Sequence, residues 1–431
     1  MKKILTVLVA VFMVLTLAGC GSKTDDSSAA GKVYYLNFKP EADAAWQELA
    51  KKYTEQTGVE VKVLTAASGE YDTTLQSELG KSSAPTMFQI GNAGAVATYG
   101  DYALDLRGTD VYNEMTTHSF DQVGEDGYTY SIGYCYESYG IIVNKALLEK
   151  AGYTVADIKD FASLKTVAED IHARSAELGF DAFTNAGLDG SSSWRFSGHL
   201  LGVALYYQFR DAGKSMSVPE ATITDAYMNT ELRNIWDLYL NNSTTDPVAN
   251  NTATGDAAEA EMKEGKAVFY QNGTWEYDAL SGALGAENIQ MIPIYMGVAG
   301  EEKAGLASGT ENCWAVNKNA SEADQKATLD FMKWVVTSEE GTTMMAEQFG
   351  PIPFKSAKTP ANVFFADANA LLAAGNYNVD WAFNATPNVD EFRAGVVSAL
   401  QAYGKEQTDD NWAKVVSAIV DGWAVQYAAT H

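Results

Sequence analysis

Val33-Tyr34-Tyr35-Leu36-Asn37-Phe38 opens the part of this 431-residue chain that decides its fold. The β-branched and aromatic residues of this run predict a strand. Pro40 suits the first turn of a following helix, whose apolar residues recur at helical spacing through residues 42–53 until Gly58 ends the pattern. Val59-Glu60-Val61-Lys62-Val63-Leu64 then alternates as a second strand. Because no hairpin signal separates the two strands, we expect them to be parallel, in a right-handed βαβ unit.

The same order of elements repeats further along the chain. Residues 71–79 have apolar side chains at helical spacing, Pro85 interrupts the chain, and residues 86–90 predict a buried strand. Ligands of such sheets bind at the carboxyl ends of the strands, which here are Lys39 and the run Gly91-Asn92-Ala93-Gly94. The two glycines of that run match neither the dinucleotide nor the P-loop pattern. They indicate either tight backbone beside a ligand or an ordinary turn.

The first twenty residues predict export. Two lysines precede an apolar run, from Ile4 to Leu15, that is too short to span a bilayer comfortably. Leu17-Ala18-Gly19-Cys20 closes this run and resembles the lipobox of bacterial lipoproteins. The resemblance implies a signal peptide at residues 1–19 and a lipid on Cys20; an ordinary signal with an incidental cysteine is the alternative. Residues 20–31 have no large apolar side chain and predict a flexible tether.

Length and charge limit what the mature chain can be. About 400 residues exceed what one hydrophobic core usually supports, so two lobes are expected. The chain has 30 basic and 56 acidic residues, a net charge of −26, which becomes −28 when Lys2 and Lys3 leave with the signal peptide. A surface this negative repels nucleic acid and anionic lipid headgroups, so we expect neither as a partner.

Motifs for catalysis, metal binding and disulfides are few. The chain contains no G-x-S-x-G elbow and no H-E-x-x-H pair, and its acidic stretch at residues 241–256 lacks EF-hand spacing. We therefore expect no metal, no cofactor and no enzymatic activity. With Cys20 assigned to lipid, only Cys135 and Cys313 remain, either as one disulfide or as two small buried side chains.

A wider resemblance rests on several segments in order. They are Gln56-Thr57-Gly58-Val59-Glu60-Val61-Lys62-Val63, Ala84-Pro85-Thr86-Met87, Tyr136-Glu137-Ser138-Tyr139-Gly140-Ile141-Ile142-Val143-Asn144-Lys145, Phe269-Tyr270-Gln271-Asn272-Gly273-Thr274-Trp275-Glu276 and Asn312-Cys313-Trp314-Ala315-Val316-Asn317. This set resembles the extracellular solute-binding proteins of bacterial ABC importers, in the carbohydrate-binding, maltose-binding-protein-like group. The resemblance spans essentially the whole mature chain.

The resemblance implies an α/β fold of the two-lobed periplasmic-binding-protein type II, with the ligand cleft between the lobes. It places residues 32–136 and 298–349 in an N-lobe and residues 137–297 and 350–431 in a C-lobe, with approximate boundaries. The crossings between lobes would then fall near residues 137–141, 293–297 and 349–353. Gly350-Pro351-Ile352-Pro353 supports the last of these, because prolines end helices and stiffen the chain.

A sugar needs aromatic faces for its C–H patches and polar groups for its hydroxyls. Trp275 follows a strand pattern at residues 267–271, and the resemblance implies a stacking aromatic there. For Trp275, Trp194 and Trp381 the alternative is a tryptophan packed against its own lobe. Lys39 and Glu137 fall on positions that bind sugar hydroxyls in the family, although Phe38 stands where the family has an aspartate. The candidate ligand-binding residues are Lys39, Tyr71, Asp72, Asn92, Glu137, Trp194, Arg195, Trp275, Glu276, Glu311 and Trp381.

These expectations combine into one function. We expect a monomeric receptor, held on the outer face of the cytoplasmic membrane, that captures an oligosaccharide and delivers it to the permease subunits of an ABC importer. Malto-oligosaccharides or other α-glucosides are the preferred ligands, and raffinose-type α-galactosides come next. An extracellular glycoside hydrolase, which needs two carboxylates about 5 to 9.5 Å apart, is one alternative. A binding protein for a peptide or an amino acid is the other.

Overall fold

The βαβ unit predicted at the start of the mature chain is present in the structure, a computed structural model that describes residues 31–67, 69–124 and 126–430. Strand β1 (Val33–Asn37) pairs in parallel with β2 (Val61–Thr65), and helix α1 (Asp43–Thr57) connects them. The helix ends at Gly58, whose φ of 75° is the left-handed conformation that glycine adopts without strain. The predicted signal peptide, Cys20 and the tether as far as Ala30 lie outside the described residues.

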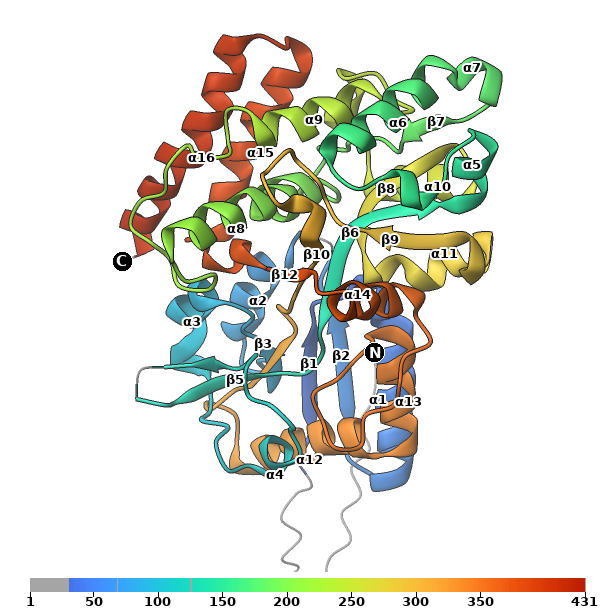
Figure 1. Cartoon of the computed structure of the whole chain (residues 1–431). Helices are drawn as coiled ribbons and strands as arrows, with labels where there is room; N and C mark the ends of the chain where they lie inside the picture. Colours follow the sequence, from blue (N-terminus) through green and yellow to red (C-terminus); the bar gives the residue numbers. More distant parts are fainter. Residues whose placement is uncertain (1–30, 68, 125, 431) are drawn as a thin grey trace, which may run out of the picture.

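The first sheet forms the N-lobe, the lower half of the molecule in Figure 1. Its order is β2-β1-β3-β11-β5-β4, in which β3 is parallel to β1 and β11 is antiparallel to both its neighbours. The other strands are β3 (Met87–Gln89), β4 (Gln122–Val123), β5 (Thr129–Gly133) and β11 (Cys313–Val316). The helices are α2 (Tyr71–Leu79), α3 (Ala93–Tyr99), α4 (Asp110–Asn113), α12 (Glu322–Thr337) and α13 (Glu339–Gln348). The buried ring of Trp46 contacts Trp314, Phe331 and Phe349, so segments far apart in the chain share one core.

The second sheet forms the C-lobe, the upper half of the molecule in Figure 1. Its order is β12-β10-β6-β8-β7, and β9 also pairs with β6. The strands are β6 (Glu137–Asn144), β7 (Asp181–Phe183), β8 (Ala267–Gly273), β9 (Ile289–Ile292), β10 (Ala304–Gly309) and β12 (Tyr377–Asp380). The helices are α5 (Lys145–Lys150), α6 (Phe161–Ala173), α7 (Ser175–Leu178), α8 (Leu201–Ala212), α9 (Glu231–Asn241), α10 (Gly255–Lys263), α11 (Tyr277–Leu284), α14 (Val363–Ala373), α15 (Val389–Lys405) and α16 (Asp409–Thr430).

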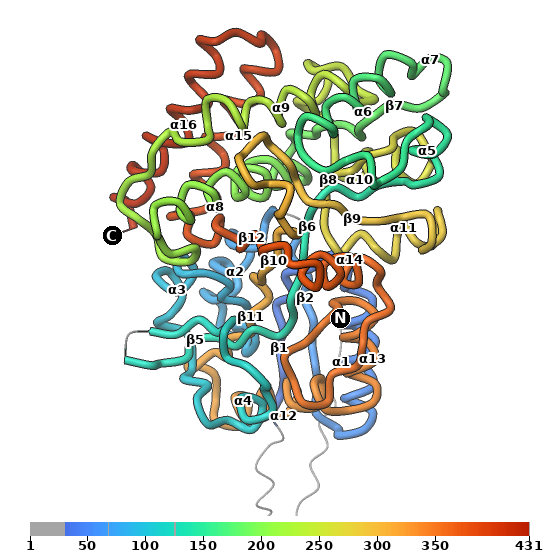
Figure 2. Tube along the Cα trace, viewed as in Figure 1, coloured from blue at the N-terminus to red at the C-terminus, as the bar shows by residue number. Residues whose placement is uncertain are grey.

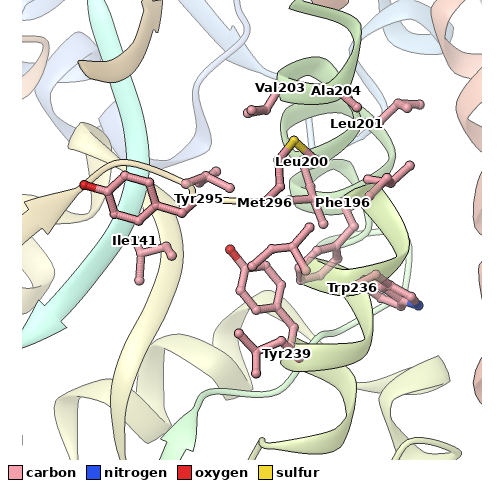
Figure 3. Close-up of a cluster of buried hydrophobic side chains, with 14 of the residues drawn as sticks. Ile141, Phe196, Leu200, Leu201, Val203, Ala204, Trp236, Tyr239, Tyr295 and Met296 are labelled. Atoms are coloured by element: carbon pink, nitrogen blue, oxygen red, sulfur yellow. The ribbon is translucent and has the colours of Figure 1, made fainter. Parts of the chain in front are cut away.

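The C-lobe core joins its sheet to helices from distant parts of the chain. Figure 3 shows Phe196 and apolar residues of α8 beside Trp236 and Tyr239 of α9, with Ile141 of β6 in the same cluster. The Trp236 ring lies 5.0 Å from Phe196 in an edge-to-face contact, a favourable aromatic arrangement. The helical patterns predict core positions for several tryptophans. Trp46, Trp236, Trp412 and Trp423 are buried as expected, whereas Trp334 is half-buried.

The chain passes between the two sheets three times (Figure 2). The first occupies residues 134–136, directly before β6. The second occupies residues 310–312, because β10 pairs with β6 and β12. The predicted N-lobe segment 298–349 therefore begins too early. The third pass follows Phe354, because Ile352 and Phe354 are buried in the N-lobe core.

The structure settles two details of the sequence pattern. The aromatic run at residues 128–145 forms two strands, and Glu137 is the first residue of the second, β6. Cys135 and Cys313 are buried free thiols, not a disulfide. Within the described ranges, no helix has the length and apolar character needed to cross a membrane. The same ranges contain no group of three or more His, Cys, Asp or Glu side chains placed to hold a metal ion.

Candidate functional site

A buried ion pair joins the two lobes. Lys39 follows β1, and Asn37 fixes its backbone by donating to the Lys39 carbonyl at 2.7 Å and accepting from the Lys39 N–H at 3.0 Å. The Lys39 Nζ lies 2.7 Å from Oε1 of Glu137 and 3.4 Å from Oε1 of Glu41. The other carboxylate oxygen of Glu137 accepts from Nδ2 of Asn312 at 2.7 Å. The end of β1, the start of β6 and the second crossing segment therefore meet at one point.

Both charges of this pair are removed from water, since Lys39 is 6% and Glu137 4% exposed. Burial disfavours the Lys39 ammonium, but the carboxylates of Glu137 and Glu41 outweigh this effect and hold the pKa of Lys39 above its ordinary value. A buried charge that loses its partner is costly. We infer that the pair stabilises the arrangement in which the lobes are in contact.

An aromatic cluster from the C-lobe lies beside this ion pair. It consists of Tyr139, Trp194, His199, Trp275, Trp381 and Phe383. His199 is central, with its ring stacked on Tyr139 at 4.2 Å and 5.5 Å from the Trp275 ring, measured between centroids. The Nζ of Lys39 lies 5.6 Å from the centroid of Trp275, within the range of a cation–π contact. The N-lobe therefore places a cation over a ring of the C-lobe.

Two polar atoms of this cluster are buried without a partner. Neither Nδ1 of His199 nor Nε1 of Trp381 has a hydrogen-bond partner among the described residues. Burial, together with the positive charges of Arg393, Lys39 and Arg195, holds the pKa of His199 well below its usual range, so its imidazole is neutral. Buried polar atoms are normally hydrogen-bonded in native proteins. The cluster therefore combines flat apolar faces with unused hydrogen-bonding capacity.

Trp275 has the best-defined position in the cluster. Its ring lies over Gly273, at whose position any Cβ would be only 2.1 Å from the ring. Its Nε1 donates to Oδ1 of Asn272 at 2.8 Å, and Nδ2 of the same amide donates to Glu276 at 2.7 Å. Burial, with some contribution from Glu259, raises the pKa of Glu276 to about 8. The partly buried ring of Trp275 is thus held in place by a polar network of its own lobe.

Glu276→Gln is expected to flatten the pH dependence of stability. With a pKa of about 8, the folded protein keeps a proton on Glu276 that the unfolded chain has already lost above its ordinary pKa of 4.5. The contribution of Glu276 to the free energy of unfolding therefore falls as pH rises from about 5 to about 8. Urea unfolding at three pH values across this window should show the free energy of unfolding of the variant rising relative to that of the unsubstituted protein as pH rises. Parallel pH profiles for the two proteins would contradict this prediction.

Several predicted site residues use their polar atoms elsewhere. Arg195 is 1% exposed, and its guanidinium donates to Ser192 and to two backbone carbonyls of its own lobe. The Asn92 side chain caps α3 by accepting from Ala95 N–H at 2.9 Å. The Tyr71 hydroxyl accepts from the backbone N–H of Gln89, and Asp72 accepts from the Tyr99 hydroxyl. The structure brings together Lys39, Glu137, Trp194, Trp275, Glu276, Glu311 and Trp381.

The sequence patterns did not point to four residues of this region. His199 lies in an irregular helical segment, Arg195–Leu200, and Phe383 in a short turn after Trp381. Asn312 belongs to the second crossing, and Arg393 to the first turns of α15. Of these four residues, only Asn312 could have been suspected from the sequence, because it follows the candidate Glu311. The other three are placed by packing between distant segments.

The sequence comparisons identify the family. The model for bacterial extracellular solute-binding proteins matches residues 48–374. The chain is a member of this family. No curated protein sequence matches it significantly. The family match places this solute-binding protein outside the cytoplasm and confirms the class of protein that the sequence resemblance implied.

Solved structures confirm the two-lobed fold. The raffinose complex of RafE has a TM-score of 0.71 at 16% identity, with 90% of this chain and 98% of that chain covered. The GacH receptor of Streptomyces glaucescens has a TM-score of 0.63 at 20% identity, with coverages of 91% and 99%. The bacterial solute receptor AcbH has a TM-score of 0.70 at 14% identity, with coverages of 92% and 100%. At these identities the likeness concerns the fold.

Proposed function

We propose that this solute-binding protein captures a neutral oligosaccharide between its lobes and delivers it to the membrane permease of an ABC importer. A lipid on Cys20 would hold it at the outer face of the cytoplasmic membrane, as a monomer. Malto-oligosaccharides or other α-glucosides are the preferred ligands, followed by raffinose-type α-galactosides. The protein performs no chemistry on the sugar.

The observation that carries this proposal is that the aromatic cluster lies beside a cationic hydrogen-bond donor and an anionic hydrogen-bond acceptor. Rings such as Trp275 suit the C–H faces of a pyranose, and charged groups form strong hydrogen bonds with hydroxyls. Lys39 and Glu137 supply a donor and an acceptor at the edge of the cluster, where Lys39 Nζ is 5.6 Å from the Trp275 ring. An apolar surface with a few polar groups that fix orientation is the usual composition of a ligand site.

The descriptions of similar proteins support the same ligand class. The RafE structure contains raffinose, the GacH receptor is described in complex with acarbose, and AcbH is described as preferring β-D-galactopyranose exclusively. These ligands differ in linkage and size, so they favour a saccharide without selecting one. The choice between α-glucosides and α-galactosides is a matter for direct binding measurements.

A thermal-shift screen tests the proposal. The mature chain carrying Cys20→Ser, which removes the lipid, is heated with maltotriose, longer malto-oligosaccharides, raffinose, xylo-oligosaccharides, a peptide mixture and amino acids. A ligand at 100 times its Kd adds about 2.7 kcal/mol of stability, so a saccharide that binds should raise the melting temperature by a few degrees. A shift with peptides or amino acids alone would refute the carbohydrate assignment. Release of smaller sugars, detected by chromatography, would favour a glycoside hydrolase.

A further inference from the structure

Asn272 lies behind the Trp275 ring, near the end of β8, and is 1% exposed. Its Oδ1 accepts from Nε1 of Trp275 at 2.8 Å and from the backbone N–H of Gly273 at 3.0 Å. Its Nδ2 donates to the Tyr270 hydroxyl at 2.6 Å and to Oε1 of Glu276 at 2.7 Å. An asparagine side chain has two acceptor sites and two donor hydrogens. All four are used within the C-lobe, so this amide has no hydrogen bond left for a ligand.

Only one orientation of the Asn272 amide satisfies its surroundings. The indole N–H of Trp275 and the backbone N–H of Gly273 can only donate, so the amide oxygen must face them. Tyr270, which accepts on the other side, precedes Asn272 by two residues in β8, so the two side chains lie on the same face of the sheet. β8 is an interior strand, between β6 and β7. The acceptor for the indole N–H is therefore itself fixed by the C-lobe sheet.

The Trp275 ring has two contacts of different kinds with this strand end. Its six-membered part lies over Gly273, where a Cβ would be 2.1 Å from Cη2 and 2.2 Å from Cζ3 of the ring. Its five-membered part is bonded to Asn272 through Nε1. Trp194 and His199 lie 5.8 and 5.5 Å away, measured between centroids, in tilted arrangements. Contact at Gly273 alone would let the ring tilt, and the hydrogen bond at its other end removes that freedom.

We propose that Asn272 is a positioning residue of the saccharide site, which fixes the plane of the Trp275 ring and thereby raises affinity without touching the ligand. This inference rests on the proposed function and adds to it a residue outside the set that contacts the sugar. A side chain that is already ordered in its bound position does not lose that freedom when the ligand arrives, so binding is tighter. Because its Nε1 is bonded to Asn272, Trp275 offers the ligand only the face of its ring.

A double-mutant cycle tests this role. Asn272→Leu keeps the volume of the side chain but removes the amide, and Trp275→Phe keeps a stacking ring but has no indole N–H. Isothermal titration calorimetry measures the Kd of the mature chain carrying Cys20→Ser for maltotriose, raffinose or xylotriose, whichever binds most tightly. Asn272→Leu should raise this Kd about fivefold when Trp275 is present. In the Trp275→Phe background the same substitution should change the Kd by less than about twofold, because the bond it removes is already absent.

Two further variants separate positioning from a general structural effect. Asn272→Asp keeps the acceptor for Trp275, and at pH 6 Glu276, with its pKa of about 8, carries a proton that it can donate to the new carboxylate. This variant should keep the Kd within about twofold. Asn242→Leu removes another buried amide of the C-lobe, whose Nδ2 donates to the Leu238 carbonyl at 2.9 Å, and should also keep it within about twofold. Circular dichroism establishes folding, and Asn272→Ala replaces Asn272→Leu if the latter does not fold.

The outcomes separate this inference from the proposed function. If none of the three saccharides binds the unsubstituted chain, the proposed function is wrong and this inference falls with it. If one binds and Trp275→Ala weakens it, but Asn272→Leu has no effect or an equal effect in both backgrounds, the positioning role is refuted and the proposed function stands. A loss of affinity in Asn272→Asp as large as that in Asn272→Leu would also refute it. A loss that depends on the indole N–H, with affinity kept in Asn272→Asp, supports the proposal.

Discussion

Lys39→Met is expected to lower the free energy of unfolding by about 3 kcal/mol and to weaken ligand binding. Methionine fills a similar volume but leaves the buried carboxylate of Glu137 without its cation, with only Asn312 as a hydrogen-bond partner. Part of that cost can be relieved if the lobes separate and water reaches Glu137. Urea unfolding measures the loss of stability. Small-angle X-ray scattering should show a larger radius of gyration for the variant.

Glu41 supplies a matched control for this experiment. Its carboxylate is 3.4 Å from the same ammonium, but its side chain is 43% exposed. Exposed ion pairs contribute little, so Glu41→Gln should cost less than about 1 kcal/mol. The double variant Lys39→Met/Glu137→Gln removes both buried charges and should recover part of the lost stability. Equal losses for Lys39→Met and Glu41→Gln would contradict the role assigned to the buried pair.

Trp275→Ala is expected to raise the Kd for the bound saccharide by about 5-fold to 150-fold, a loss of about 1 to 3 kcal/mol. The ring is partly buried, lies under the Lys39 ammonium and contacts Trp194 and His199. Its removal deletes a stacking face and the surface on which the cation rests. Calorimetry with the saccharide that gives the largest thermal shift measures the effect. Unfolding should remain cooperative, because the sheet of the C-lobe does not depend on this ring.

Two further variants test whether the loss of affinity is specific to the position of the Trp275 ring. Gly273→Ala places a methyl group where the Trp275 ring now lies, 2.1 Å from its atoms, so the ring must move although it is still present. We expect this variant to lose affinity as well. Trp334→Ala removes a half-buried tryptophan from α12, in the N-lobe core, and should leave the Kd within about twofold. A loss of affinity in Trp334→Ala equal to that in Trp275→Ala would indicate a general effect of destabilisation.

The fold was predictable where a local pattern decides the structure. The βαβ unit, the helix at residues 71–79 and the buried Trp46 follow from periodicity, Pro40 and Gly58. The crossings were placed less well, because membership of a lobe depends on strand pairing between distant segments. Residues 304–309 pair with β6 and β12, and nothing in their own composition indicates that partner.

The site was predictable where residues follow strands. Lys39 after β1 and Trp275 after β8 lie at strand ends, and the family resemblance singled out Glu137 at the start of β6. His199 and Arg393 come from helical segments, and their place in the site depends on how α8 and α15 pack on the sheet. Arg195 shows the converse, because the loop chemistry around Trp194 does not reveal that its guanidinium turns into the lobe.

The rings of the aromatic cluster all belong to one lobe, and this has a consequence for the order of events in capture. Trp194, His199, Trp275 and Trp381 contact one another within the C-lobe, so these contacts do not depend on the N-lobe. Under the proposed function, a sugar would bind to these C-lobe rings first, and the N-lobe would then close over it and contact it through Lys39. Substitutions in the aromatic cluster should lower the association rate constant, and substitution of Lys39 should raise the dissociation rate constant. Initial binding and retention of the ligand are thus assigned to different lobes.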